Sequence, residues 1–423
     1  MTPNSAVISH LDTGYDRPLR DPLWQDLSLS GEILRIIDTA PFQQLNRIKQ
    51  LGPSYLVYPG ATHTRLAHSL GVFHLARRMI RALAVQRDCI PLSLDGTRAF
   101  LVAALCHDLG HFPFTHSFKE LPLAEHEVLT GRLLQEPPLS KRIKDDLGLD
   151  PAFIAAIVDG TLPEDGSDEL RFYRNLLSGA LDPDKLDYLN RDAYFCGVPY
   201  GLQDIEFALR NIRPNGAEGL ALHARGVSAV ENILFSKYLM YRAVYWHKTV
   251  RVATAMIKKA IHSALTAGQL APEDLYGLDD ELFAARFVDH RYPPLQLIGK
   301  VYRRELYKTA YELPFDSENP RHTGLAELSR RARVEREIAH ELGERSEQPF
   351  GVIIDLPEPV SFEFKLPLTD GNTLTTAQHA GTVFTPQVVA DFTRTLRRLR
   401  VMVAPELRHR LAREPERVLS PWL

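Results

Sequence analysis

Residues 103–116 read AALCHDLGHFPFTH, and this stretch decides the fold. It continues an apolar run that starts at Leu101, and a helix that is apolar on every side is normally buried. Such a helix carries His107 and Asp108 into the interior. His111 follows four residues after His107 and is expected on the same side of the helix.

Gly110 and Pro113 are expected to end this helix, with His116 just beyond the break. A buried carboxylate beside several imidazoles is costly unless something pairs them. A divalent cation would do so, because neutral imidazole and carboxylate are both good ligands for first-row metals. The ordinary alternative is a salt-bridged Asp108 with hydrogen-bonded histidines. Three further stretches with the pattern of a site favour the metal.

The composition bounds the class of protein. The chain has 423 residues, enough for one large domain with a subdomain. Its 50 basic and 53 acidic residues give a net charge of -3, with no sign of an extended nucleic-acid or membrane surface. The three cysteines are scattered, and we find no signal segment and no apolar run long enough to cross a bilayer. We therefore expect a cytoplasmic protein.

The chain divides into three predicted parts. Residues 1–28 read as an irregular arm, 29–268 as a mainly α, helical-bundle core, and 269–423 as a smaller mixed α+β subdomain. Helices are predicted over 29–39, 41–51, 65–83, 227–265, 273–287, 294–313 and 386–402. Strands are predicted over 350–356 and 360–367.

The predicted helix 65–83 holds a second histidine of interest. Val72 and Met79 mark its apolar face at helical spacing, and His68 lies on that face one turn before Val72. His68 therefore points inward, as a ligand or as a core histidine satisfied by a backbone carbonyl. His74 falls among arginines on the expected wet side and is given no role.

The stretch 181–196 reads LDPDKLDYLNRDAYFC and forms the third pattern. Asp184, Tyr188 and Asp192 recur every four residues, so they make one polar stripe along a helix. A stripe of this kind is most often a solvated face. The apolar residue before it and the aromatic, low-charge segment after it favour a partly buried position instead.

Two weaker signals complete the pattern. Lys237, Tyr241 and Tyr245 also recur every four residues, which suggests a wet groove that could meet phosphate rather than a plain core face. His126 opens an amphipathic helix and could face the site, although a histidine at a helix start is more often at the surface.

Together these stretches resemble the HD-domain phosphohydrolases. The stretches are RLAHSLGV (65–72), ALCHDLGHFPFTHS (104–117), EHE (125–127) and LDPDKLDYLNRDAY (181–194). More narrowly, LRIIDTAPFQQLNRIKQLG (34–52) and YPGATHTRLAHSLG (58–71) resemble the HD-domain deoxynucleoside triphosphate (dNTP) triphosphohydrolases. The resemblance runs from about residue 34 to 261, and beyond 268 it fades.

The resemblance implies a metal and a reaction. His68, His107, Asp108 and Asp184 would bind one divalent metal, for which Mn, Fe, Co, Ni, Zn or Mg are all admissible. The metal would act as a Lewis acid and lower the pKa of a bound water. Attack at the α-phosphorus would release a deoxynucleoside and inorganic triphosphate.

The resemblance also implies roles for the residues around the metal. His111 and His126 are the implied acids for the leaving oxygen, and His116 belongs to the same catalytic group. Arg65, Lys185 and Lys237, with His116, would hold the triphosphate. Gln50, Tyr188, Asp192 and Tyr245 would surround the sugar, with Tyr241 beside them; Asp192 would accept from the 3′-hydroxyl and Tyr245 would crowd the 2′ position.

Members of the implied family often form tetramers activated by nucleotides bound between subunits. The residues here that would serve such a site are Asp38, Gln43, His247 and Lys248, with Asn46 in place of the expected arginine. The chain departs from the pattern at Lys119, where an acidic residue would orient the acid histidine, so that Glu120 or Glu125 would have to substitute. Trp246 stands at a position that is polar in a mammalian relative.

Two other functions remain open at this stage. An HD phosphohydrolase acting on nucleoside monophosphates, cyclic nucleotides or alarmones would share the metal ligands, but the cations Arg65, Lys185 and Lys237 favour a polyphosphate. A nucleotide sensor or single-strand nucleic-acid-binding protein would bind without turnover. The near-neutral net charge and the complete set of metal ligands argue against that function.

Overall fold

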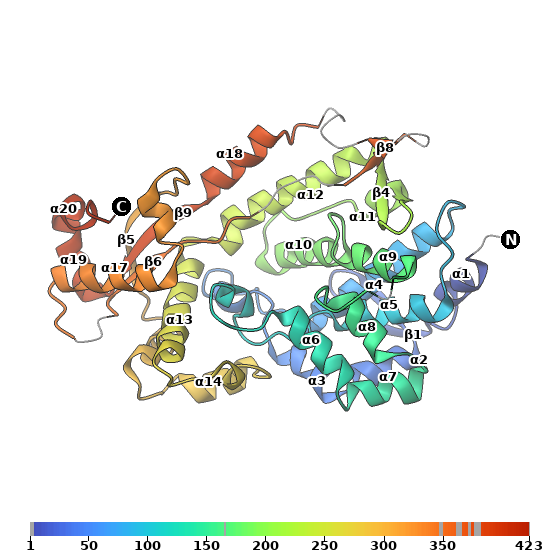
Figure 1. Ribbon diagram of the computed structural model, residues 1–423, viewed down its shortest axis with the longest axis horizontal. Helices are drawn as coiled ribbons and strands as arrows, with labels where there is room; N and C mark the ends of the chain where they lie inside the picture. Colours follow the sequence, from blue (N-terminus) through green and yellow to red (C-terminus); the bar gives the residue numbers. More distant parts are fainter. Residues whose placement is uncertain are drawn as a thin grey trace.

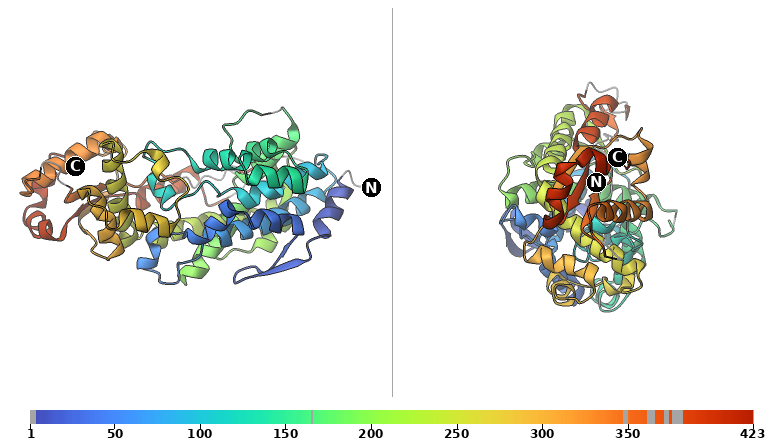
Figure 2. Two further views of the ribbon diagram at one scale, coloured as in Figure 1. Left: turned by 90° about the horizontal axis from the view of Figure 1, so that it is seen from below. Right: turned by 90° about the vertical axis from the view of Figure 1, so that its left-hand side faces the viewer.

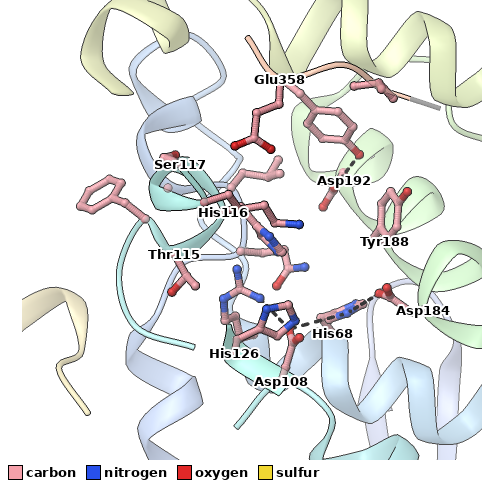
Figure 3. Close-up of a pocket in the computed structure, with 18 of the residues that line it drawn as sticks. His68, Asp108, Thr115, His116, Ser117, His126, Asp184, Tyr188, Asp192 and Glu358 are labelled. Carbon is pink, nitrogen blue, oxygen red and sulfur yellow. Dashed lines mark hydrogen bonds and ion pairs between the residues drawn. The ribbon is translucent and has the colours of Figure 1, made fainter. Parts of the chain in front are cut away.

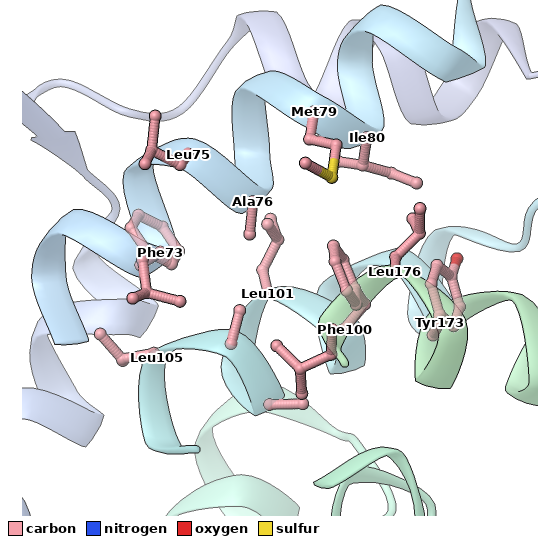
Figure 4. Packing of buried hydrophobic residues seen from close by; sticks show 14 of the residues in the cluster. Phe73, Leu75, Ala76, Met79, Ile80, Phe100, Leu101, Leu105, Tyr173 and Leu176 are labelled. Atoms are coloured by element: carbon pink, nitrogen blue, oxygen red, sulfur yellow. The ribbon is translucent and has the colours of Figure 1, made fainter. Parts of the chain in front are cut away.

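Two helices form the centre of the larger lobe of the computed structural model, which describes residues 4–164, 166–346, 350–360, 366–370, 374–375 and 382–422. They are α4 (Arg65–Ala84) and α5 (Leu94–Cys106). Figure 4 shows Ala76, Met79 and Ile80 of α4 facing Phe100 and Leu101 of α5. All five side chains are buried, which is why α5 shows no polar side in this region.

The molecule is elongated, with the two ends of the chain at opposite ends of the long axis (Figures 1 and 2). The larger lobe contains α1 (Ser5–Asp12), α2 (Gly31–Ile37), α3 (Ala40–Gln44), α6 (His126–Gln135), α7 (Leu139–Leu147), α8 (Pro151–Val158), α9 (Asp168–Leu177), α10 (Pro183–Cys196), α11 (Ile205–Asn211) and α12 (Val227–Met240). It also carries β3 (Ile212–Pro214) and β4 (Leu220–His223), which pairs with β7 (Leu368–Thr369) and through it β8 (Leu374–Thr375). The mainly α class is confirmed.

The smaller lobe combines helices with one antiparallel sheet. The strand order is β5 (Lys308–Pro314), β9 (Arg398–Val403), β6 (Val352–Asp355). The helices are α13 (Lys248–Thr266), α14 (Asp280–Phe287), α15 (Gln296–Tyr302), α16 (Pro320–Gly324), α17 (Leu328–Glu341), α19 (Pro405–Arg413) and α20 (Pro415–Leu419). Helix α18 (Pro386–Leu396) connects to this lobe but packs on α12, where the rings of Phe392 and Tyr238 stack. This lobe is mixed α+β, as predicted.

Two apolar cores follow the two lobes. The first surrounds α4 and α5, and the second gathers α13, α17 and the β5–β9–β6 sheet. The second core also includes Phe112 and Phe118, which come from the loop after α5. The loop that follows the His107–Asp108 pair is therefore anchored in the opposite lobe. The domain boundary at 268 stays a prediction, and α13 already contributes Val252 to the second core.

Several predicted elements are wrong. Residues 1–28 were expected as an irregular arm, but they contain α1 and most of a hairpin of β1 (Arg17–Asp21) and β2 (Gln25–Leu29). The predicted helix 227–265 is interrupted by a π-helical turn, η5 (Tyr241–Tyr245), before α13 begins at Lys248.

The last residues of two further predicted helices, 294–313 and 386–402, form strands instead. Residues 308–314 and 398–403 form β5 and β9, because pairing across the sheet outweighs their local helix preference. The strand at 352–355 is confirmed. The strand predicted over 360–367 falls largely on residues 361–365, which lie outside the described residues. Among the described helices we find none that combines the length and the apolar character needed to span a bilayer.

Candidate metal centre and its cavity

Helix α5 ends at Cys106, and His107–His111 form a turn rather than a helical continuation. The turn still brings the predicted side chains together. Gly110 permits this, since a Cβ there would lie 2.2 Å from the backbone oxygen of His126. Thr130 of α6 accepts from the Gly110 N–H at 2.8 Å and donates to the His107 carbonyl at 3.0 Å. The motif is thus fastened to the first turns of α6.

Four predicted ligands converge in the interior. Ligand atoms of His68 (α4), His107 and Asp184 (α10) all lie within 4.8 Å of one another. His68 Nε2 is 3.0 Å from Asp184 Oδ1, and His107 Nε2 is 3.3 Å from Asp108 Oδ1. Figure 3 shows His68, Asp108 and Asp184 side by side at the floor of the site.

The chemistry of this set fits a divalent cation. The His107 ring is held by Nδ1 at 2.9 Å from the Ala104 carbonyl oxygen, which leaves Nε2 as the lone-pair nitrogen. That buried Nε2 makes no hydrogen bond to any described residue. Burial lowers the pKa of His68, but hydrogen bonds to Asp184 and Asp187 outweigh it and raise the pKa to about 10. The site therefore favours one positive charge among its carboxylates.

A buried carboxylate behind His68 was missed by the sequence analysis. Asp187 Oδ2 lies 2.8 Å from His68 Nδ1. Arg191 donates to both oxygens of Asp187 at 2.8 and 2.9 Å and to Asp21 at 2.7 Å. Trp24 of the hairpin β1–β2 donates to Asp187 through its indole N–H. Burial raises the pKa of Asp187, and Arg191 and His68 reverse this and hold it well below its ordinary value.

A cluster of three histidines lies beside the metal ligands. His111 follows the turn, His116 lies in the 3₁₀ turn η3 (Thr115–Phe118), and His126 is the first residue of α6. The ring centroids of His111 are 3.9 Å from those of His126 and 4.6 Å from those of His116. Burial lowers the pKa of His111 and of His126 well below the ordinary value, helped by Arg65 and His116 respectively.

A cavity of about 650 Å³ opens above these groups. Figure 3 shows Tyr188 and Asp192 of α10 on one wall and Thr115–Ser117 on the other. The predicted site residues that line the cavity are Gln50, Arg65, His68, His107, Asp108, His116, His126, Asp184, Lys185, Tyr188, Asp192, Lys237, Tyr241 and Tyr245. His111 is 2% exposed and stays behind this wall, outside the described lining.

Two of the predicted cationic side chains of the cavity already pair with carboxylates of the protein. Arg65 donates to Asp108 Oδ2 at 2.6 Å, while its Nε has no partner among the described residues. Lys185 pairs with Asp182, the N-cap of α10, and donates to the Gly179 carbonyl at 2.9 Å. Burial lowers the pKa of Lys237 to about 8, and Lys185 adds to the effect.

Asp192 is held from two sides. The Tyr245 hydroxyl donates to Asp192 Oδ2 at 2.7 Å, and His63 Nε2 lies 2.8 Å from Oδ1. His63 is buried against Phe195, with ring centroids 4.6 Å apart. The sequence analysis missed His63, although it stands in the quoted segment YPGATHTRLAHSLG. The side-chain oxygen of Gln50 is buried without a hydrogen bond to any described group.

Several other residues discussed from the sequence lie away from the cavity or have other partners. His74 is not on a wet face: it stacks on Trp24, and burial lowers its pKa to about 4. Glu120 does not orient a histidine, because it pairs with Arg331 and Lys258. Asp38, Gln43, His247 and Lys248 are outside the described lining of the cavity.

The local surroundings of those four residues are ordinary. Asp38 is exposed at the end of α2, and Gln43 donates to the Ile37 carbonyl at 2.9 Å. His247 Nδ1 accepts from the Thr249 N–H at 3.2 Å at the start of α13, and Lys248 is exposed. Their predicted role in nucleotide activation stays a prediction.

Both lobes of the chain match known protein families. Residues 65–168 match the HD domain, and residues 207–420, half of the chain, match the HD associated region. An uncharacterized protein of Methanocaldococcus jannaschii is 35% identical over 71% of this chain and 61% of its own length. The deoxynucleoside triphosphate triphosphohydrolase SAMHD1 of Gallus gallus is 29% identical over 68% of this chain and 55% of its own length.

A solved structure is similar over nearly the whole chain. It is a hypothetical protein from Aquifex aeolicus, 26% identical, with a TM-score of 0.72 over 94% of this chain and 99% of that one. The chain thus spans little more than half the length of the two curated relatives and nearly all of this structure.

Proposed function

The chain belongs to the family of HD-domain proteins that carry an HD-associated region, and from this we propose that it hydrolyses deoxynucleoside triphosphates to deoxynucleoside and inorganic triphosphate. One observation carries the proposal. A single cavity is lined by the metal ligands, by the cations Arg65, Lys185 and Lys237, and by the Asp192–Tyr245 pair. The likeness to the Gallus gallus triphosphohydrolase supports the same substrate class.

His68, His107, Asp108 and Asp184 would hold the divalent cation. When bound, it supplies a Lewis acid for a phosphate oxygen and a water of lowered pKa. The chain's own part is to fix the ligands. Asp187 holds His68 and the Ala104 carbonyl holds His107, so both rings present Nε2 to the centre.

The cationic side chains of the cavity would bind the triphosphate. Lys185 and Lys237 come from facing helices, and Arg65 and His116 approach from the floor and the opposite wall. Asp108 holds Arg65 through Nη1 at the edge of the cavity, so Arg65 would present a fixed positive charge to a phosphate oxygen. Several fixed cations suit the dispersed charge of a triphosphate better than that of a monophosphate.

The Asp192–Tyr245 pair would recognise the sugar. Asp192 is held by His63 and Tyr245, so its carboxylate is fixed to accept from a 3′-hydroxyl. Tyr245 would fill the space that a 2′-hydroxyl needs. Tyr188, Tyr241 and Gln50 line the same region.

The 5′-oxygen gains negative charge as it leaves, and a nearby side chain must stabilise that charge. His111, His116 and His126 are the cluster beside the metal ligands, and we assign this task to them. We also propose a homo-oligomer, tetramer or dimer of dimers, in which Asp38, Gln43, His247 and Lys248 take part in binding an activating nucleotide.

Product analysis tests the proposal. The protein is incubated with each of the four dNTPs, singly and mixed, with Mn²⁺ or Mg²⁺ and with or without GTP, and the products are separated by ion-pair chromatography. We expect deoxynucleoside and triphosphate, lost in Asp108→Ala and kept in His409→Ala, an exposed histidine of α19. Monophosphate with pyrophosphate, orthophosphate, or no metal-dependent product would overturn the proposal.

A further inference from the structure

Glu358 lines the cavity from the smaller lobe, on the side away from the metal ligands. We propose that Glu358 and the nearby Lys119 select the base of the nucleotide and favour guanine. This inference rests on the proposed function and deepens it, because it concerns which deoxynucleoside triphosphate the cavity takes. The metal centre and the groups that would bind the triphosphate and the sugar involve neither residue.

The order of groups along the cavity supports this assignment. In Figure 3 the metal ligands His68, Asp108 and Asp184 lie at the floor, Asp192 lies above them, and Glu358 lies above Asp192. A nucleotide presents phosphate, sugar and base in the same order. With the phosphates at the metal and the sugar at Asp192, the base would reach the part of the cavity that carries Glu358.

The smaller-lobe side of the cavity is also more apolar than its floor. Glu358 belongs to a short segment that follows β6. This segment, the end of η5 and the start of α13 contribute apolar side chains to the lining, namely Trp246, Val250, Leu356, Pro359 and Val360. Trp246 and Val360 belong to one apolar cluster. Ligand sites commonly combine apolar walls with a few polar groups that fix orientation, and the flat faces of a base suit such walls.

Two cations on this side of the cavity already have partners. Lys258 donates to Glu120 at 2.7 Å, and Arg251 donates to Asp355 at 3.0 Å. Both cations line the cavity, but their charges are balanced by carboxylates of the protein. They therefore offer a triphosphate less than the metal and the cations at the other end do. This difference favours the orientation in which the base, and not the phosphates, meets Glu358.

Glu358 and Lys119 differ from these pairs. Both line the cavity, and neither has a hydrogen bond or an ion pair to any residue that the structure describes. Partial burial raises the pKa of Glu358 and the charge of Glu120 adds to the effect, whereas Lys119 opposes it. Lys119 is thus near enough to act on this carboxylate. A partly desolvated carboxylate without a donor of its own is stabilised by a ligand that donates hydrogen bonds to it.

The chemistry of the two side chains indicates the base. An ionised carboxylate only accepts, and guanine alone among the four bases presents two adjacent donors, N1–H and the 2-amino group, to its two oxygens. The ammonium of Lys119 only donates, and it would meet the neighbouring O6 of guanine. Thymine presents one N–H between two carbonyl oxygens, which Glu358 would repel. We therefore expect dGTP to be favoured most strongly over dTTP.

Base discrimination in Glu358→Gln tests this inference on the full chain. Two quantities are measured for dGTP and dTTP: kcat/KM for triphosphate release with Mn²⁺, and Kd by calorimetry in EDTA, where metal-dependent turnover is absent. The unmodified protein should prefer dGTP. In Glu358→Gln the dGTP:dTTP ratio should fall at least about 10-fold, within the range typical of one bidentate contact to a base. Deoxyinosine triphosphate lacks the 2-amino group, so its disadvantage against dGTP should shrink in the same variant.

Matched variants make the result specific. Glu416→Gln removes the same charge from an exposed position on α20 and should leave both ratios unchanged. Lys119→Gln should also lower the preference for dGTP, and circular dichroism checks that each variant is folded. The proposed activator residues lie outside the described lining of the cavity, so nucleotide bound there is common to all variants.

The outcomes separate this inference from the proposed function. No preference for dGTP in the unmodified protein, or an unchanged ratio in Glu358→Gln, would overturn the role of Glu358. Triphosphate release that accompanies either result would leave the proposed function standing. A preference for dGTP in binding that Glu358→Gln removes, without triphosphate release from any dNTP, would overturn the proposed function alone.

Discussion

Asp187 shows how a single buried side chain can control the metal centre without touching the metal. It is fully buried, and it contacts His68, Arg191 and Trp24 at once. Such outer partners fix the orientation of a histidine ligand and raise its basicity.

We expect Asp187→Asn to weaken the binding of Mn²⁺ by about 10–100-fold, because the amide keeps the shape but loses the charge that supports His68. Titration calorimetry on stripped protein measures this. Asp150→Asn is the matched control, since Asp150 caps α8 away from the site. Equal affinities in the two variants would remove Asp187 from this role.

Tyr245 makes two contributions that substitutions can separate. Its hydroxyl holds Asp192, and its ring occupies the sugar region of the cavity. We expect Tyr245→Ala to raise activity on ribonucleotides relative to deoxyribonucleotides. Tyr245→Phe keeps the ring, so it should raise KM while preserving the preference for the deoxy sugar. Measured kcat/KM ratios for paired substrates decide this, and an unchanged ratio in Tyr245→Ala would contradict it.

At the scale of elements, Glu120 fastens the loop of η3 to the smaller lobe. Its carboxylate accepts from Arg331 of α17 at 2.9 and 3.1 Å and from Lys258 of α13 at 2.7 Å. Lys258 and Arg331 are both buried. Burial raises the pKa of Glu120, and the two cations outweigh it and lower the pKa to about 2.

Glu120→Gln should lower the free energy of unfolding by about 3 kcal/mol near neutral pH, because it removes the negative charge that the two buried cations share. The pKa is lowered on folding, so the ionised group stabilises the protein above about pH 4.5. That stabilisation is lost as the pH falls towards 2. Urea unfolding of both proteins at several pH values tests this. A difference that stays constant from pH 7 to pH 3 would show that the charge of Glu120 is not its cause.

The elements also show where local sequence patterns fail. Helix α4 was predicted within one residue, because its apolar spacing and its packing agree. Strand β9 reads RLRVMV and was taken as the end of a helix, although it is the central strand of its sheet. Its partners β5 and β6 lie about 90 and 45 residues earlier in the chain, so no short window of sequence contains the reason for the strand.

At the scale of the whole molecule, the site residues that were predicted lie in local sequence motifs, whereas those that were missed depend on contacts between distant segments. His68, His107, Asp108 and Asp184 stand in short motifs with helical or adjacent spacing, and the fold brings them together. Trp24 acts on Asp187 from 163 residues away, through a hairpin that was not predicted. Contacts of that range depend on the packing of α4, α10 and the hairpin, which the sequence pattern alone does not specify.

Metal binding should stabilise the whole native chain, since the ligands come from α4, the turn after α5 and α10. At a free Mn²⁺ concentration about 100 times the Kd, the expected gain is about 2.7 kcal/mol. Urea unfolding with Mn²⁺ and with EDTA measures it. Asp108→Ala should show no gain and His409→Ala the full gain; a gain in both would mean that Mn²⁺ acts elsewhere.

The hydrogen bond from Trp24 to Asp187 has a practical consequence. The chain has three tryptophans, Trp24, Trp246 and Trp422, and only the first donates to the carboxylate behind His68. An indole N–H can only donate, so its excited state senses the charge of that carboxylate directly. Filling the site would replace the proton between His68 and Asp184 by the cation, and so change the electric field of the His68–Asp187 pair at the indole. The intrinsic fluorescence of Trp24 would then report occupancy in real time, without any added dye.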